Sequence, residues 1–276
     1  MEAELNRHMA ALLQKIRNEK PLVLNITNTV SSDLVANALL ALGASPVMAH
    51  AQEEMETLAS QAACVCLNIG TLDPALVDSQ LLAARHAQQA ILDPVGVGAS
   101  PFRKQACQDH LAVPSLKILK GNFAEIKTLA YLQGWTEATS AISKGVDSME
   151  EGDHRAAEAL CKSFSHRPMI VIQTGRVDYL VSNEDRFAIW NGSEAMRSVT
   201  GMGCACTALI AACVACAPQN PVMASLCGLL LSGIAGEMAE AAHLGPGSFR
   251  VHYLDALFKI DSEIFLRRAR WESCRK

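Results

Sequence analysis

A short glycine-rich motif, Gly201-Met202-Gly203-Cys204, stands directly before an uncharged, alanine-rich run that ends at Ala217. The two glycines let the backbone turn sharply, and the start of a helix adds partial positive charge that attracts phosphate or a developing oxyanion. The same position favours the thiolate form of Cys204. The motif therefore indicates phosphoryl-transfer chemistry. A Gly-x-Gly helix start is also common as a tight turn that only permits close packing. Whether this one binds an anion must therefore be judged from chemically suitable residues elsewhere in the chain.

Polar side chains follow three predicted strands. Asp93 ends one apolar run and precedes a glycine-rich loop, and Thr174 ends another. Lys120 ends a third run, with Glu125 in the first turn of the helix that follows. Ligands of open α/β sheets bind beyond the carboxyl ends of the strands, and two carboxylates, a lysine and a Gly-x-Gly helix start together suit Mg²⁺ and nucleotide phosphates. Taken singly, Glu125 is equally well explained as a helix-dipole partner and Lys120 as a solvated surface charge.

Short apolar runs alternate with amphipathic segments, a pattern that predicts α/β layering around a mostly parallel sheet. No Gly-x-x-x-x-Gly-Lys-Ser/Thr motif occurs, which excludes a P-loop enzyme. Residues 133–153 lack a clear pattern and are interpreted as a loop or short helix, and we expect residues 1–276 to form one domain. Strands are predicted at 21–27, 46–49, 64–69, 90–93, 117–120, 169–173, 179–182 and 186–190, and helices at 4–17, 31–42, 53–61, 74–89, 122–131, 203–217, 221–243 and 251–268.

The composition predicts a soluble cytoplasmic protein. The chain has 276 residues, of which 50% are hydrophobic and 19% charged, enough for a large core. Its net charge of -4 argues against nucleic-acid binding, and its ten irregularly spaced cysteines predict reduced thiols. The apolar run 222–235 is short for a membrane span, the charged N-terminus carries no secretory signal, and the basic tail 267–276 is interpreted as a solvated, frayed end.

Several motifs follow one another in a recognisable order: Asn25-Ile26-Thr27-Asn28, 37–48, 68–72, 92–95, Gly121-Asn122 with Glu125-Ile126, Gly203-Cys204, and 245–249. In this order, between about residue 21 and about residue 260, the chain resembles the hydroxyethylthiazole kinase family of thiamine-salvage enzymes. The resemblance implies a ribokinase-like layered fold, with a mostly parallel central sheet and helices on both faces. It also implies phosphorylation by MgATP of the primary alcohol of 4-methyl-5-(2-hydroxyethyl)thiazole.

The resemblance assigns the substrate side of the site. Cys204 stands where ribokinase relatives have an aspartate that faces the substrate hydroxyl, and the other matching positions are Asn25, Met48, Gly201 and Gly203. From the residues alone, Asn25 and Asn28 are explained either as ligand-binding amides or as helix caps. Family members form trimers with active sites between subunits, so the resemblance implies a homotrimer in which Asn25 and Met48 face such a site.

The resemblance also assigns the nucleotide side: Lys120 and Thr174 match ATP-binding positions, and Asp93 and Glu125 match positions that organise Mg²⁺. Two positions depart from the family, which usually has Arg in place of Lys120 and Thr in place of Met202. Lysine keeps the charge without the bidentate fork, so weaker nucleotide binding is expected. Met202 is expected to add bulk beside the phosphate path.

The expected mechanism is in-line transfer, driven mostly by positioning and charge neutralisation. A thiol has an ordinary pKa of about 8.5, and the helix start is expected to lower the pKa of Cys204 enough for it to accept the alcohol proton. Cys204 is otherwise explained as a small residue in a crowded turn.

Three other functions stay open on the sequence. One is a related kinase of another small alcohol, such as hydroxymethylpyrimidine. Another is a nicotinamide-nucleotide hydrate dehydratase of similar fold. The third is a non-catalytic nucleotide-binding relative. The first two classes should carry aspartate in place of Cys204, and Met202 and Lys120 make the third conceivable.

Overall fold

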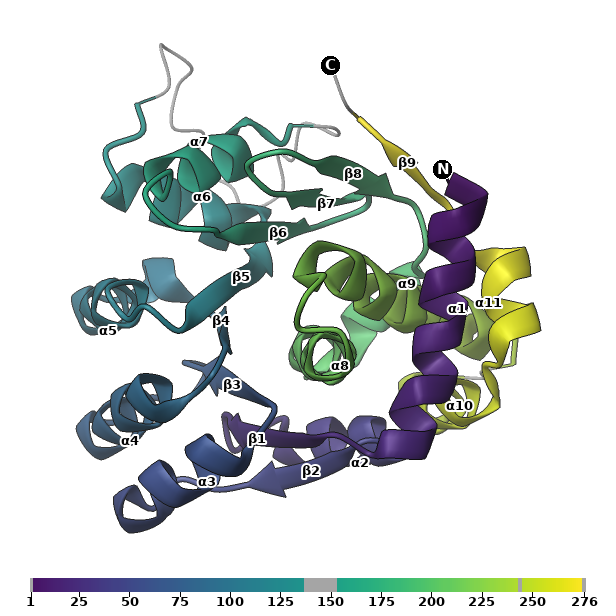
Figure 1. The fold of residues 1–276 in the computed structure, drawn as a ribbon, viewed down its shortest axis with the longest axis horizontal. Helices are drawn as coiled ribbons and strands as arrows, with labels where there is room; N and C mark the ends of the chain where they lie inside the picture. Colours follow the sequence, from purple (N-terminus) through teal and green to yellow (C-terminus); the bar gives the residue numbers. More distant parts are fainter. Residues whose placement is uncertain (1, 137–152, 243–244, 275–276) are drawn as a thin grey trace.

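The computed structural model describes residues 2–136, 153–242 and 245–274. These residues form a nine-stranded sheet with the order β2-β1-β3-β4-β5-β6-β7-β8-β9, which Figure 1 shows nearly edge-on. The first six strands along the chain pair in parallel, and the last three pair antiparallel. The prediction of a mostly parallel α/β sheet is therefore confirmed. The strands are β1 (Leu22–Ile26), β2 (Ser45–Met48), β3 (Cys64–Asn68), β4 (Ala90–Asp93), β5 (Leu116–Asn122), β6 (Ile170–Thr174), β7 (Asp178–Val181), β8 (Arg186–Ile189) and β9 (Trp271–Ser273).

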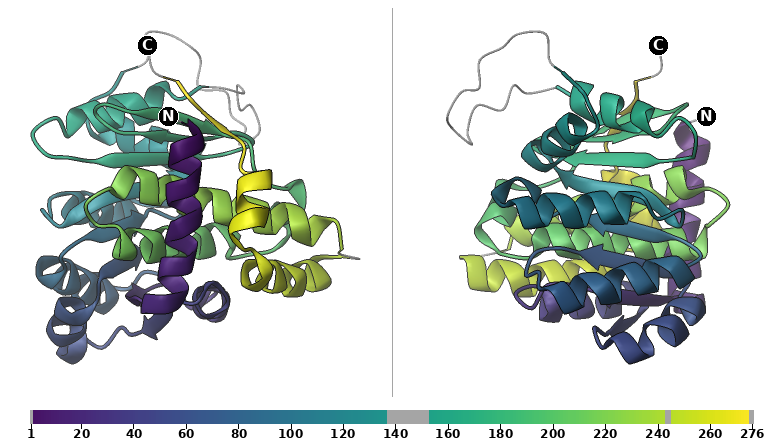
Figure 2. Two further views of the ribbon diagram at one scale, coloured as in Figure 1. Left: turned by 45° about the vertical axis from the view of Figure 1, so that its right-hand side comes forward. Right: turned by 90° about the vertical axis from the view of Figure 1, so that its left-hand side faces the viewer.

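Helices cover both faces of the sheet, as the two turned views in Figure 2 also show. Helices α3, α4, α6 and α7 pack on one face, and α8 packs on the opposite face against β1, β3 and β4. The α-helices are α1 (Glu2–Glu19), α2 (Ser32–Leu42), α3 (Met55–Gln61), α4 (Pro74–His86), α5 (Pro101–Leu111), α6 (Phe123–Leu132), α7 (Arg155–Ser163), α8 (Met202–Cys216), α9 (Pro221–Glu240), α10 (Pro246–Lys259) and α11 (Ser262–Arg268). Short 3₁₀ turns lie at η1 (Gln52–Glu54), η2 (Val97–Ala99) and η3 (Glu194–Ser198).

The central strands are apolar on both faces because each face is covered by helices. Along β3, the side chains of Cys64 and Cys66 belong to the core beneath α8, whereas those of Val65 and Leu67 belong to the core beneath α3 and α4. This alternation follows from the two-residue period of a strand. The sheet thus separates two apolar cores, and its carboxyl ends lie beside the start of α8.

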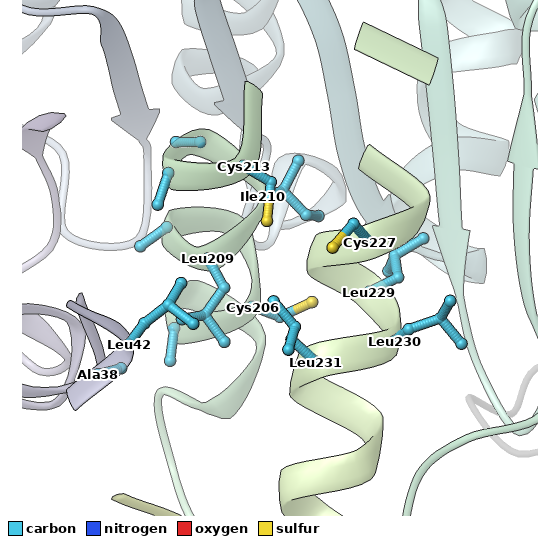
Figure 3. Close-up of a cluster of buried hydrophobic side chains, with 14 of the residues drawn as sticks. Ala38, Leu42, Cys206, Leu209, Ile210, Cys213, Cys227, Leu229, Leu230 and Leu231 are labelled. Atoms are coloured by element: carbon cyan, nitrogen blue, oxygen red, sulfur yellow. The ribbon is translucent and has the colours of Figure 1, made fainter. Parts of the chain in front are cut away.

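Helices α8 and α9 form the interior of one core, and Figure 3 shows Ile210 and Cys213 of α8 on the side of the helix toward Cys227 of α9. A β-carbon at Gly228 would lie 2.5 Å from the Cα of Ile210, so the close approach of the two helices depends on this glycine. By length and composition α9 is sufficient to span a membrane, contrary to the prediction from run 222–235. Its most apolar window is 78% buried within the protein, which makes α9 a core helix here.

Several predicted elements differ from the structure. Helices α5 and α7 were not predicted, and the predicted helix 251–268 is two helices, because Asp261 caps α11 by accepting a hydrogen bond from the amide of Ile264. The prediction of a frayed tail is wrong for Trp271–Ser273, which pairs with β8 while the Trp271 ring packs edge-on against Phe187. Residues 137–152 of the unpatterned stretch, and the tail's last two residues, lie outside the described part of the chain.

Candidate active site

A cavity of about 380 Å³ lies at the carboxyl ends of the parallel strands, beside the start of α8. This is the location at which open α/β sheets bind their ligands. The structure brings seven of the nine predicted site residues together around it. They are Asp93, Lys120, Glu125, Thr174, Gly201, Gly203 and Cys204.

The start of α8 is built around Gly201. This residue has a φ of +88°, a conformation that favours glycine, and a β-carbon there would lie 2.9 Å from the Cβ of Ser31. The first α-helical bond runs from the amide of Ala205 to the carbonyl of Gly201. The amides of residues 202–204 precede that bond, and glycine has no side chain with which to cap them. They are therefore suited to bind an anion in the cavity.

Met202 points away from the cavity. Its side chain is 5% exposed and belongs to the apolar core that contains α8 and α9. The expectation that Met202 adds bulk beside the phosphate path is therefore wrong. The sequence could not reveal this, because the residues of a first helical turn face different sides of the helix.

Lys120 and Asp93 form a buried charged pair at the floor of the cavity. The Lys120 ammonium is 4.0 Å from Asp93 Oδ2 and donates a hydrogen bond of 2.9 Å to the carbonyl of Gly203. Asp93 Oδ2 also accepts a 2.9 Å bond from the Thr207 hydroxyl on α8. Burial opposes the charged form of Lys120, but nearby anionic groups, with Asp93 first among them, outweigh it and raise the pKa of Lys120 above its ordinary value. Lys120 is thus a buried cation paired with Asp93, and the alternative of a solvated surface charge is excluded.

Glu125 joins the loop after β4 to the start of α6. One carboxylate oxygen accepts the amide of Gly96 at 2.8 Å, and the other accepts the amide of Asn122 at 2.8 Å. Asn122 in turn caps the amide of Glu125, which completes a capping box. Burial, and next the charge of Asp93, raise the pKa of Glu125 above its ordinary value.

The donor set of the cavity fits a hard divalent cation. Asp93 and Glu125 offer carboxylate oxygens to the same cavity, and each keeps acceptor capacity beyond the hydrogen bonds described above. After burial, the charge of Asp93 contributes most to the raised pKa of Glu125, and a cation between the two carboxylates would relieve this repulsion. Among the described residues no three His, Cys, Asp or Glu side chains cluster as a metal site. Such a cation would therefore take further ligands from water or from the nucleotide phosphates.

Cys204 lies against two asparagine side chains. The amide of Asn68, at the end of β3, donates to its sulfur at 3.2 Å, and the amide of Asn28 donates at 3.4 Å. Burial and next the nearby charge of Asp93 raise the pKa of Cys204, against the opposing effects of Ser31, Lys120 and Asn28. The expectation that the helix start lowers the pKa of this thiol below its ordinary value is therefore wrong, because burial, which the sequence does not show, has the largest effect on it.

Asn25 and Met48 do not line this cavity. They are register partners on β1 and β2, and β2 is the edge strand of the sheet. Met48 is 37% exposed, whereas Asn25 is buried, donates its amide to the Val23 carbonyl and leaves its side-chain oxygen without a partner in the part of the chain that the structure describes. The two residues therefore lie side by side, Met48 on the edge strand and Asn25 on the strand next to it.

The sequence did not single out Asn68, Thr207 or Arg103 as site residues. Asn68 ends a strand in the same way as Asp93, with which it pairs in register, so the strand-end rule could have found it. Thr207 lies one helical turn beyond Gly203, on the same face of α8. No sequence pattern identifies Arg103, because its hydrogen-bond acceptors are backbone carbonyls and not side chains.

Arg103 fixes the loops that follow β3 and β4. Its guanidinium donates to the carbonyls of Ile69 at 2.5 Å, Val95 at 2.7 Å and Gly70 at 2.7 Å. Replacing it with lysine should lower the free energy of unfolding by about 1.5–3 kcal/mol, because one ammonium cannot reproduce the planar fork. Urea denaturation tests this, with the exposed Arg85→Lys as the control. A loss below about 0.5 kcal/mol, the usual size of a surface substitution, would contradict it.

The described sheet and its covering helices have the ribokinase-like fold. Pyridoxal kinase from Staphylococcus aureus, solved in complex with AMP-PCP, has a TM-score of 0.65 to this structure at 13% identity, covering 93% of this chain and 99% of that chain. This likeness shows the shared fold.

The Hydroxyethylthiazole kinase family model matches residues 13–263, and the chain belongs to that family. Among curated relatives, hydroxyethylthiazole kinase of Pyrococcus horikoshii is 40% identical over 256 residues, covering 91% of this chain and 93% of that protein. That of Aliivibrio salmonicida is 39% identical over 260 residues, covering 93% and 94%. A solved structure of the Pyrococcus horikoshii OT3 protein has a TM-score of 0.87 at 37% identity, covering 97% of this chain and 99% of that one.

Proposed function

We propose that this chain transfers the γ-phosphoryl group of ATP to the primary alcohol of 4-methyl-5-(2-hydroxyethyl)thiazole, in thiamine salvage. The observation that carries the proposal is the cavity in which a cysteine and the uncapped amides of α8 face a buried lysine and two carboxylates. Aspartate-bearing relatives place a carboxylate where this chain has Cys204. The cysteine therefore favours the thiazole alcohol over the hydroxymethylpyrimidine and nucleotide-hydrate alternatives.

The nucleotide phosphates are proposed to lie between Lys120 and the start of α8. The amides of residues 202–204 and the Lys120 ammonium would offset the charge on the transferred phosphoryl group. Thr174, whose hydroxyl donates to the Gly121 carbonyl at 3.3 Å, is proposed to contact the nucleotide at the end of β6. Asp93 and Glu125 would hold Mg²⁺, which, when bound, neutralises phosphate charge.

An assay of ADP release separates this proposal from its alternatives. With ATP, Mg²⁺ and the thiazole alcohol, ADP should form only when the alcohol is present, and the hydroxymethylpyrimidine alcohol should give a much lower kcat/KM. The phosphorylated product is identified by mass spectrometry. If ATP binds but the thiazole releases no ADP, the proposed kinase activity is wrong and the non-catalytic alternative is favoured.

Cys204 is proposed to accept the substrate proton late in phosphoryl transfer, in its thiolate form, which burial makes the minor form by raising the pKa of Cys204. Replacing it with alanine should lower kcat about 10-fold with little change in KM for ATP, because most of the catalysis comes from positioning and charge neutralisation. Cys204→Asp should retain activity, since a carboxylate is also a proton acceptor. Steady-state kinetics for the two variants test this, and an unchanged kcat in the alanine variant would remove Cys204 from the role of base.

We also propose a homotrimer in which Asn25 and Met48 reach an active site shared with a neighbouring subunit. The support is their position side by side on β1 and the edge strand β2, where the buried side-chain oxygen of Asn25 lacks a partner among the described residues. Light scattering coupled to size exclusion should give a mass three times that of the chain. The proposal further treats residues 1–276 as one kinase domain built on the nine-stranded sheet, working in the cytoplasm, where thiols stay reduced.

A further inference from the structure

The side chains of Asn28 and Asn68 form a small polar cluster behind Cys204. Asn28 follows β1, Asn68 ends β3, and the Asn28 amide donates to Asn68 Oδ1 at 2.8 Å. Both residues are buried, at 4% and 3% exposure, and Asn28 lies at the wall of the cavity. Two adjacent parallel strands therefore bring two primary amides to one sulfur atom.

The orientation of each amide is fixed by a backbone donor. The oxygen of Asn68 accepts the Gly70 amide at 2.9 Å, and the oxygen of Asn28 accepts the Ser31 amide at 2.9 Å. A backbone N–H can only donate, so neither side-chain amide can exchange its oxygen and nitrogen without losing these bonds. Both NH₂ groups must therefore face the sulfur of Cys204.

A sulfur atom that faces two donors acts as an acceptor on that side. If Cys204 is a thiol, its proton must point elsewhere, and if it is a thiolate, the two N–H groups stabilise the negative charge. Two charged groups act on the sulfur in opposite directions, Asp93 on β4 and Lys120 on β5, and the side chain of Ser31 favours the ionised form alongside Lys120. A base in this buried position therefore needs donors that favour its ionised form.

We propose that Asn28 and Asn68 are positioning residues for phosphoryl transfer, which hold the Cys204 sulfur as a hydrogen-bond acceptor with a free lone pair directed to the cavity. This inference rests on the proposed kinase activity. In that reaction the alcohol oxygen forms a bond to the γ-phosphorus, and the bond from that phosphorus to the bridging oxygen of ADP breaks, with its electron pair leaving on ADP. The hydroxyl proton passes to the Cys204 thiolate, and the two amides hold the sulfur in place.

The test uses Asn68→Asp, which is nearly isosteric. The aspartate keeps the oxygen that accepts from Gly70 and Asn28 but turns an acceptor instead of a donor toward the sulfur. In the parent protein kcat should fall about fivefold, whereas in a Cys204→Ala background the same change should have less than about a twofold effect. Asn220→Asp, at the cap of α9 and remote from the cavity, is the matched control and should leave kcat unchanged. Equal losses with and without the cysteine would overturn the proposal.

A second measurement does not depend on kinase activity. Iodoacetamide alkylates thiolates, and Cys204 and Cys274 are the partly exposed cysteines of this chain, the other eight being buried. In Asn68→Asp, alkylation of Cys204 at pH 8 should slow about tenfold, while Cys274 in the same sample is unchanged. Asn28→Ala should slow it less, because its contact to sulfur is the longer one. Unchanged alkylation of Cys204 in both variants would overturn the positioning role, whether or not the thiazole alcohol proves to be the substrate.

Discussion

Asp93→Asn is expected to lower kcat about 1,000-fold, which corresponds to about 4 kcal/mol of transition-state stabilisation. Asp93 is 2% exposed, lies at the floor of the cavity and faces the ammonium of Lys120. Asparagine keeps an oxygen for the Thr207 hydroxyl but removes the negative charge that would hold Mg²⁺. Because the geometry is kept while the charge is lost, the effect should be on the reaction rather than on the shape of the site.

The same substitution leaves Lys120 as a buried cation without its nearest carboxylate. Removing one partner of a buried pair typically costs about 3–5 kcal/mol of stability, so the melting temperature should fall as well. Assays must therefore be made well below that temperature, on protein shown to be folded by circular dichroism. Asp73→Asn is the matched control, since Asp73 only caps α4 and asparagine caps a helix equally well. A folded Asp93→Asn protein with kcat within threefold of the parent would show that Asp93 does not hold the catalytic metal.

The strands of the sheet could be predicted well because the sequence pattern that indicates a strand is local. Apolar runs of four to seven residues ended by Gly, Asp or Thr mark the buried strands, and parallel pairing then brings Asp93, Lys120 and Thr174 to one edge. That edge, together with Gly201 and Gly203 at the start of α8, forms most of the cavity. Helix α5 was not predicted because polar residues are frequent between Arg103 and Asp109. They obscure the pattern of its buried face, which consists of Ala106, Cys107, His110 and Leu111.

The remaining errors concern properties that depend on distant parts of the chain. The helix start beside Cys204 is visible in the sequence, but its burial and the charge of Asp93, which raise its pKa, come from tertiary packing. Lys120 could be buried or solvated until Asp93 and the Gly203 carbonyl were seen to pair with it. Likewise, β9 pairs with β8, and Trp271 packs against Phe187, a residue far from it in the sequence. Local patterns in the sequence identify the candidate site residues, whereas long-range contacts determine the protonation and solvent exposure of those residues.

Gly201→Ala is expected to lower kcat/KM about 100-fold, because an error of about 1 Å in a positioning group can cost that much. Alanine at this position would have two separate unfavourable effects, backbone strain and a steric clash. Its φ of +88° is unfavourable for alanine, and the added methyl group would lie 2.9 Å from the Cβ of Ser31 at the start of α2. To relieve the contact, α2 or the start of α8 must move, and with it the amides of residues 202–204 that face the cavity.

Gly134 separates these two effects, because it has a φ of +87° and, among the described residues, no atom within 4 Å of the place where an alanine methyl group would lie. Gly134→Ala should therefore cost about 1 kcal/mol of stability from backbone strain alone and leave kcat/KM unchanged. Gly201→Ala should show the same strain together with the loss of activity and a raised KM for ATP, measured by steady-state kinetics and by thermal denaturation. If both alanine variants lose the same stability and neither loses activity, the start of α8 tolerates displacement, and its amides do not position the transferred phosphoryl group.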